Sequence, residues 1–451
     1  MKVLRILVLA MLPLSFLASA EASELSFPEV WNHIAGNTPS EKAVKSELEA
    51  AQLGAARSQR HWFPVLYLDA KGYDTNDPGA ALFSKLSQRQ ISPADFSPTL
   101  LNHPDAQLIE KVTLGLNLPL YEGGVRVANS EIAQIQARAK ALEAQATQQG
   151  VFLETARSYQ NIAIEERILK SLNHLDKVLS EILSRYRLGS KANPVGYSGL
   201  LGLQGLKNRI SGLQLEKQAK IQTYYGALTK MAGEQSGALP DKWQPRAEGI
   251  IEFAHAHLKS AMVAKPLGSL RLQSMETAAL ASDQMASMEK ARFLPRVGLF
   301  AENSLTHGNR DTSSSQTAGA YLQWDLFSAS NFGSIKQAQA SSAAAHARVS
   351  EARLREDIEV LGSQQATRAL EESLKLLIDS ARLLAEQTEV AKKLFNSGAM
   401  NALQFAEVLN RRADLLAAIE QAETEYLNTQ ITLASHFGAA NVTTINGETH
   451  E

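Results

Sequence analysis

The residues most suited to chemistry in this chain are two histidines one residue apart, His255 and His257. Imidazole nitrogens bind zinc, but a zinc site normally has three or four protein ligands. The chain contains no cysteine, and no cluster of acidic residues lies close to the two histidines. We therefore expect no metal site here, and we interpret His307 and His450 as solvated side chains.

The sequence patterns of common catalytic sites are missing. The phosphate-binding pattern G-x-x-x-x-G-K-[ST], the zinc-binding pattern H-E-x-x-H and the nucleophile pattern G-x-S-x-G do not occur. The acidic residues along the chain occur singly. We interpret them as solvated helix faces or as the lining of a lumen, and not as a pair of acids for general acid–base catalysis. The sequence therefore predicts neither an enzyme nor a cofactor.

Composition and the N-terminus narrow the class of protein further. The formal net charge is only −2, without the basic excess of a nucleic-acid binder. Lys2 and Arg5 precede a short apolar run over 6–17, and small-x-small sites end at Ala20 and Ala22. This pattern predicts a secretory signal peptide over 1–22, cleaved near 20–22; the alternative is a buried N-terminal helix. Beyond it, no run of 18 or more apolar residues occurs, so any membrane insertion must use strands.

The chain repeats itself. Residues 60–65 (R-H-W-F-P-V) are similar to residues 292–297 (R-F-L-P-R-V). Similar segments follow these two hexapeptides in the same order. The expected organisation is a signal peptide over 1–22, a first repeat over 23–232, an irregular connector over 233–268, a second repeat over 269–437 and a flexible C-terminal tail over 438–451.

Each repeat contains a very long predicted helix. Proline-free segments cover about 125–188 and 334–397, and further helical segments follow over 195–232 and 402–437. From Ile132 onward, apolar residues recur at alternating spacings of three and four, which is typical of helices packed with coiled-coil-like seams. At 1.5 Å per residue, a helix of roughly 64 residues extends about 96 Å. No single globular core needs such a helix, so we expect walls, stalks or rods.

Strands are predicted from alternation. In 112–120, five aliphatic side chains alternate with Thr113, Gly115 and Asn117, and similar patterns cover 66–71, 297–302 and 318–327. Runs of about nine or ten residues suit tilted strands that cross a bilayer, although an ordinary sheet packed on a protein core gives the same pattern. Residues 74–110 and 303–317 are expected to be long polar loops. Four strands cannot close a barrel, and open edges cannot face lipid, so a membrane location requires several chains.

The ordered set of features is similar to the TolC-like outer membrane efflux protein family. The resemblance rests on the signal peptide, the duplicated helix–hairpin–long helix–turn–helix halves and the strand end L-N-L-P-L-Y-E-G-G at 116–124. Residues 81–105 also resemble a first-loop signature of part of that family. The resemblance implies an α+β membrane protein: a long α-helical coiled-coil barrel continuous with a transmembrane β-barrel completed by oligomerisation, with four strands per chain and an internal two-fold repeat.

The resemblance also implies a function, a location and partners. It implies an outer membrane channel that serves a tripartite efflux or type I secretion system without its own energy source, with its helical barrel in the periplasm. The expected partners are two further copies in a homotrimer, a periplasmic adaptor, an inner-membrane pump of the RND or ABC type and outer membrane lipid. The alternative is a soluble periplasmic coiled-coil adaptor or stalk protein. The exported substrate stays open among drugs, metal ions, polysaccharides and polypeptides.

Two interhelical turns are the candidate functional site that the resemblance implies. The adaptor-docking residues would be Arg187, Leu188, Gly189, Ser190, Asn396, Ser397, Gly398 and Ala399. The residues of the periplasmic aperture would be Val195, Phe395, Met400, Gln404 and Glu407. Because Gln404 and Met400 replace an acid and an arginine of the family pattern, we expect an apolar constriction at Val195, Phe395 and Met400. The alternative is that Phe395 and Met400 pack between helices.

Overall fold

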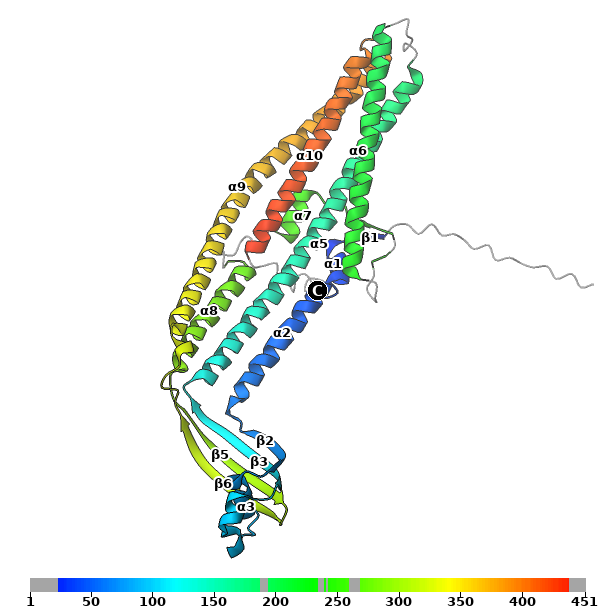
Figure 1. Cartoon of the computed structure of the whole chain (residues 1–451). Helices are drawn as coiled ribbons and strands as arrows, with labels where there is room; N and C mark the ends of the chain where they lie inside the picture. The colour runs from blue at the N-terminus through cyan, green and yellow to red at the C-terminus, as the bar shows by residue number, and fades with distance from the viewer. Residues whose placement is uncertain (1–22, 187–193, 234–238, 241, 259–267, 438–451) are drawn as a thin grey trace, which may run out of the picture. The chain divides into compact units, whose positions relative to one another are not determined.

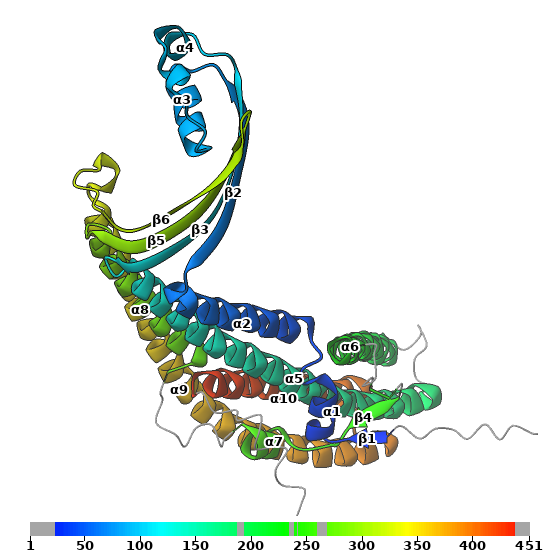
Figure 2. The same ribbon diagram turned by 90° about the horizontal axis from the view of Figure 1, so that it is seen from below.

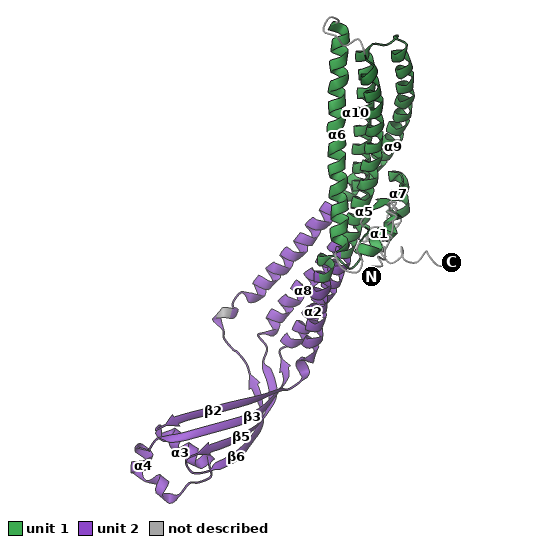
Figure 3. Cartoon of the chain, turned by 90° about the vertical axis from the view of Figure 1, so that its right-hand side faces the viewer, with its two compact units in different colours: residues 1–42, 148–267, 359–451 green, residues 43–147, 268–358 purple. Residues whose placement is uncertain are grey.

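The computed structural model describes residues 23–186, 194–233, 239–240, 242–258 and 268–437. The predicted signal peptide and C-terminal tail lie outside these residues. Long helices combined with a four-stranded antiparallel sheet confirm the expected α+β class. The chain forms two compact units, one from 1–42, 148–267 and 359–451 and the other from 43–147 and 268–358 (Figure 3). Each unit therefore combines segments from both halves of the sequence.

A similar succession of elements occurs in both halves, with helices between the two hairpin strands only in the first half (Figure 1). In the first half the elements are β1 (Ser23–Leu25), α1 (Phe27–Ile34), α2 (Pro39–Ser58), η1 (Gln59–Trp62), β2 (Val65–Thr75), α3 (Pro78–Ser87), η2 (Pro93–Phe96), α4 (Pro98–Asn102), β3 (Gln107–Glu122), α5 (Val125–Arg185) and α6 (Pro194–Ala232). In the second half they are β4 (Trp243–Pro245), α7 (Ile250–His257), α8 (Leu270–Ala291), β5 (Arg296–Gly308), β6 (Thr312–Gln323), η4 (Ala329–Asn331), α9 (Ser334–Asn396) and α10 (Ala402–His436).

The four long helices agree closely with the sequence prediction. α5 has 61 residues and α9 has 63, and both begin within a residue of the predicted start. Pro194 occupies the first position of α6, where its missing N–H costs nothing. Asn401 caps α10 by accepting a hydrogen bond from the Gln404 amide. Among the described residues, no helix combines the length and the apolar composition needed to cross a membrane.

The unit that contains α6 and α10 has an extended apolar core. Phe27 and Trp31 of α1 pack edge-on against Phe152 of α5, with ring centroids 5.3 and 5.1 Å apart. β1 and β4 form a short parallel pair, and the Tyr159 hydroxyl donates to the Leu25 carbonyl at 2.8 Å. β1, at the start of the described chain, is thereby attached to β4, which lies in the segment between the two repeats.

Buried charges also join three helices of this unit. Lys217 of α6 lies 2.5 Å from Glu420 of α10 and 3.6 Å from Glu165 of α5, and Lys220 pairs with both acids. Burial and the neighbouring Glu420 raise the pKa of Glu165. Burial also pushes the pKa of Glu420 upward, but the hydrogen bonds from Lys217 and Lys220 outweigh it and lower that pKa. The two lysines and the two acids form one network across α5, α6 and α10.

The sheet of the other unit is a plain antiparallel meander in the order β2-β3-β5-β6. Thr113 of β3 lies opposite Ser304 of β5, and their hydroxyl oxygens are 2.9 Å apart. Within the described residues, no further strand pairs with the outer edges of β2 and β6. Both edge strands consequently keep unpaired backbone groups.

The two faces of this sheet differ as the alternation predicts. One face carries exposed aliphatic side chains, among them Leu66, Leu68, Val112, Leu114, Leu116, Leu299, Leu305 and Leu322. The opposite face, here called the polar face, carries Tyr67, Asp69, Lys71, Thr113, Glu302 and Ser304. Leu66 is 67% exposed and Leu322 is 69% exposed, so no described part of the chain covers the apolar face. The alternative of a sheet packed on its own protein core is therefore not observed.

The prediction of a long polar loop was wrong for the second hairpin, whereas the first hairpin has a long connection that is shorter than predicted and partly helical. Residues 303–317 belong mostly to β5 and β6, which are joined by residues 309–311. Both faces are polar near this turn, with His307, Ser314 and Gln316 on the otherwise apolar side, so alternation could not reveal the strands. Residues 76–106, here called the insert, contain α3, η2 and α4, and β3 already begins at Gln107.

Two glycines form the junction between β3 and α5. Gly123 and Gly124 have φ angles of +66° and +92°. A Cβ atom on Gly123 would lie 2.2 Å from the Ala291 carbonyl oxygen, whereas the nearest atom to a Cβ on Gly124 would be 3.9 Å away. The turn from strand to helix thus depends on glycine at both positions, and at Gly123 also on close contact with α8.

We predict that Gly123→Ala destabilises the fold more than Gly124→Ala. Both changes place an L-residue at positive φ, which costs about 1–2 kcal/mol, but only the first adds a clash with a backbone carbonyl. Urea unfolding in detergent, followed by circular dichroism, should give a clearly lower midpoint for Gly123→Ala. Equal midpoints would show that α8 moves freely to make room.

Candidate functional site at the interhelical turns

Five of the predicted site residues line one cavity in the unit that contains α6 and α10, whereas Ser397, Ala399, Gln404 and Glu407 are not part of its lining. This cavity, here called the turn cavity, has a volume of about 720 Å³. Its lining comes from the last turns of α5 and α9, the first turns of α6 and α10 and the α9–α10 turn. Predicted site residues in the lining are Val195, Phe395, Asn396, Gly398 and Met400. Arg187, Leu188, Gly189 and Ser190 lie outside the described residues and stay predictions.

The turn between α9 and α10 is shaped by a left-handed glycine. Gly398 has a φ of +79°, and its amide donates to the Phe395 carbonyl at 3.1 Å. The Ala399 amide donates to the Leu394 carbonyl at 2.9 Å, which satisfies the end of α9 in the usual manner of a glycine cap. No atom lies within 4 Å of a Cβ built on Gly398, so the backbone requires glycine there while the space around it is open.

Gln404 has a local structural role. Its side-chain oxygen accepts a hydrogen bond from the Asn401 amide at 3.1 Å, while the Asn401 side chain accepts from the Gln404 amide at 2.9 Å. This reciprocal pair is a capping box, which satisfies two amides at the start of α10. Glu407, the other predicted acidic-ring position, pairs with Arg411 one turn later at 3.0 Å.

An aromatic stack connects three of the helices around the turn cavity. The Phe395 ring stacks on Tyr186 at a centroid distance of 6.2 Å and on Phe405 at 5.2 Å. The Tyr186 hydroxyl donates to the Gly196 carbonyl at 3.0 Å. Phe395 and Met400 are half-buried against the apolar core, as the packing alternative expects. Val195, in contrast, is 69% exposed.

Sequence reasoning missed several residues of the turn cavity. Glu181 of α5 pairs with Lys392 of α9 at 2.9 Å, and the hydrogen bond from Lys392 is the main reason that the pKa of Glu181 is lowered. Tyr186 could have been found, because it precedes Gly189 by three residues just as Phe395 precedes Gly398. The Glu181–Lys392 pair carries no comparable signal, because single charges on long helices usually face solvent.

Histidines were the only metal-ligand candidates in the sequence. His257 lies 3.7 Å from Glu248, and burial lowers its pKa. In the part of the chain that the structure describes, no three His, Asp or Glu side chains come together in a group that could hold a metal ion.

Comparison with known proteins gives a family match and a fold match. Residues 267–439 match the sequence profile of the family described as outer membrane efflux protein. No curated protein matches the sequence.

Several solved structures share the fold over nearly the whole chain. The MtrE outer membrane channel of Neisseria gonorrhoeae, in its open state, has a TM-score of 0.74 at 12% identity, with 92% of this chain and 89% of that chain covered. The CmeC outer membrane channel of Campylobacter jejuni has a TM-score of 0.73 at 14% identity, with 94% and 89% covered. The outer membrane protein VceC of Vibrio cholerae has a TM-score of 0.72 at 15% identity, with 92% and 96% covered.

These matches agree with the repeats, the strand ends and the turn geometry described above. The profile covers the second half of the chain, and the fold similarity extends to the first half, which the profile does not reach. The resemblance to the family is thereby confirmed: residues 267–439 match the outer membrane efflux protein family, and the chain shares its fold with solved outer membrane channels.

Proposed function

We propose that this chain forms an outer membrane channel of an efflux system, with one β-barrel completed by several copies. The observation that carries the proposal is the four-stranded sheet, which has an exposed apolar face, a polar face and two unpaired edges. Lipid accepts the apolar face but not the edges, because unpaired backbone groups cost several kcal/mol in hydrocarbon. Pairing β2 of one copy with β6 of the next removes both edges and turns the polar face toward a lumen.

Three copies suit this barrel best. Two copies would supply eight strands, whose interior is largely filled by side chains, whereas three supply twelve and leave room for a pore. A homotrimer is also what the family resemblance implies. The alternative of a soluble adaptor would leave the apolar face of the sheet exposed to water.

Exposed aromatic residues support a membrane boundary near the helix-proximal ends of the strands. They are Trp62, Phe63, Tyr121, Phe293, Trp324, Phe327 and Phe332. The Trp324 indole donates to the Phe293 carbonyl at 3.0 Å, which joins the two ends of the β5–β6 hairpin. Aromatic girdles of this kind mark both interfaces of outer membrane barrels. The long helices would then begin at the periplasmic interface.

The finer features of the proposal follow partly from the sequence patterns and partly from the resemblance. Residues 1–22 act as a signal peptide, 23–232 and 269–437 are the repeats, 233–268 connects them with β4 and α7, and 438–451 is a tail. The channel conducts without an energy source and receives substrates through a periplasmic adaptor from an RND or ABC pump, in efflux or type I secretion. The turns at 187–190 and 396–399 dock the adaptor, and the open space around Gly398 supports this assignment.

The first experiment on this proposal separates inner and outer membranes and measures the mass of the detergent-solubilised particle. We expect an outer membrane particle of three chains, because only closed edges are stable in lipid. A soluble periplasmic monomer or dimer would contradict the channel and favour the adaptor alternative.

A second prediction concerns the apolar aperture. Phe395→Ala combined with Met400→Ser should raise single-channel conductance in planar bilayers if these side chains restrict the pore. Val390→Ser is a matched control, because Val390 is exposed on the same helix and does not line the turn cavity. Unchanged conductance together with reduced thermal stability would assign Phe395 and Met400 to helix packing.

A third prediction concerns adaptor docking. Gly398→Trp should weaken crosslinking to the adaptor while trimers still form, because the open space around Gly398 accepts a side chain that would block a partner. Gly398→Ala is the control, since alanine carries the same strain of an L-residue at positive φ as tryptophan but adds little bulk. If both variants fail to assemble, Gly398 is structural and the docking role is refuted.

A further inference from the structure

The insert between β2 and β3 is a compact folded segment. Its three short helices, α3, η2 and α4, each begin with proline, which suits the first helical position. The side chains of Asp77 and Ser97 accept hydrogen bonds from backbone amides at the starts of α3 and α4. These caps hold the insert in one shape, so it can support an ordered contact with the sheet.

The insert covers the polar face of the sheet beside the β5–β6 turn. A Cβ atom on Gly308 would lie 2.3 Å from the Gln88 amide nitrogen, which places the end of α3 directly on that face. Thr306 and Ile109, also on the polar face, are only 7% and 4% exposed. Figure 2 shows the sheet bent, with α3 on its concave side. In a closed barrel the concave, polar side is the lumen.

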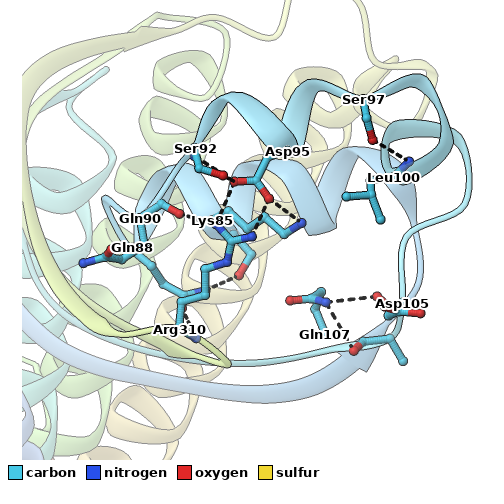
Figure 4. Close-up of polar contacts among 12 residues, drawn as sticks. Lys85, Gln88, Gln90, Ser92, Asp95, Ser97, Leu100, Asp105, Gln107 and Arg310 are labelled. Atoms are coloured by element: carbon cyan, nitrogen blue, oxygen red, sulfur yellow. Dashed lines mark hydrogen bonds and ion pairs between the residues drawn. The ribbon is translucent and has the colours of Figure 1, made fainter.

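An ion pair attaches the insert to the turn between β5 and β6 (Figure 4). The Arg310 guanidinium donates to both carboxylate oxygens of Asp95, one of them at 2.7 Å, and also to the Gln90 carbonyl. Lys85 donates to Asp95 at 3.1 Å, and the Ser92 amide and hydroxyl donate at 2.8 and 2.9 Å. Asp95 is buried, so its charge depends on these donors.

Three consecutive residues of the insert add polar contacts to the same turn. The Gln88 side-chain oxygen accepts from the amides of Arg310 and Asp311, both at 2.9 Å. Gln90 donates to the Asp311 carboxylate at 3.1 Å. Arg89 donates to the Ser314 carbonyl at 3.1 Å from a backbone with a φ of +56°, unusual for a residue other than glycine. We call the contacts of Gln88, Arg89, Gln90 and Asp95 with residues 310–314 the latch.

We infer that the insert is a gate that closes the end of the barrel lumen at the β5–β6 turn and that the latch holds it shut. The inference rests on the proposed function, because only a closed barrel makes the polar face a lumen. In a trimer, three inserts would occupy the same mouth. Each would bring exposed apolar residues that do not pack on the sheet: Phe83, Leu86, Phe96 and Leu100.

The chemistry of the latch indicates what opens it. The hydrogen bonds from Arg310 hold the pKa of Asp95 well below its usual range, so the carboxylate stays charged in mildly acidic surroundings. Its stabilising contribution is present above the ordinary carboxyl pKa and is lost only as the pH falls through the lowered value. Mild acid therefore leaves the gate shut, and opening requires the contacts with Arg310 to be replaced or pulled apart.

Single cysteines can test the gate, because the chain has none of its own. Thr306→Cys places a thiol on the polar face beneath the insert, and Thr99→Cys places one on the exposed surface of α4. Intact cells are treated with a membrane-impermeant, thiol-reactive maleimide. We expect rapid labelling at position 99 and slow labelling at position 306.

The latch is then broken in the Thr306→Cys background. Arg310→Gln and Asp95→Asn should each raise the labelling rate about tenfold or more, the effect expected from losing a buried charge-assisted contact. Asp105→Asn is the matched control, because Asp105 is exposed on the same insert and lies outside the latch. Trimer assembly is checked for each variant.

Removing the insert gives a second measurement. Thr75 and Gln107 are direct register partners, so an Asn-Gly turn can replace residues 76–106 without changing strand pairing. This variant should label fastest at position 306. If position 99 labels and position 306 labels equally fast in all variants, the gate is refuted while the channel stands. If position 99 does not label in intact cells, the proposed orientation of the channel itself fails.

Discussion

The unpaired edges of one sheet are the constraint on which the rest of this structure depends. β2 and β6 leave backbone groups without partners, and the apolar face between them is exposed along its whole length. For a single copy, water leaves the apolar face exposed to solvent, and lipid leaves the backbone groups of the edges without hydrogen-bond partners. The repeat in the sequence supplies two hairpins to the same sheet, and the glycine turn after β3 lets the next long helix begin without extending the sheet.

The two proposed constrictions, at the turn cavity and at the insert, are held by different kinds of contact. The turn cavity is lined by the ends of four helices, and the Phe395 ring stacks between Tyr186 and Phe405. The insert is held by charge and by backbone hydrogen bonds, with Asp95 and Arg310 at the centre. The first contact is therefore apolar, whereas the second joins a buried carboxylate to an exposed guanidinium by a bidentate, charge-assisted pair.

Much of the fold could be predicted because periodicity reports burial. The ranges of α5, α6, α9 and α10 follow from apolar spacing and from the absence of proline, and the two faces of β3 follow from alternation. The tips of β5 and β6 could not be found, since serine and threonine occupy both faces there. The latch could not be predicted either, because Asp95 and Arg310 are 215 residues apart in the sequence. Each looks like an ordinary charged residue of a loop. Among the residues that line the turn cavity, Val195, Phe395 and Met400 were predicted through the family resemblance. Tyr186 and the Glu181–Lys392 pair were not predicted.

The buried network of Lys217, Lys220, Glu165 and Glu420 has a consequence for how the helices align. Long seams of alanine and leucine fit almost equally well after a slide of one turn, about 5.4 Å, because the apolar pattern nearly repeats. The network exists at only one alignment of α5, α6 and α10, and any slide would leave buried charges without partners. These few charged side chains thus fix the register of the three helices, which the apolar seam alone would leave undetermined.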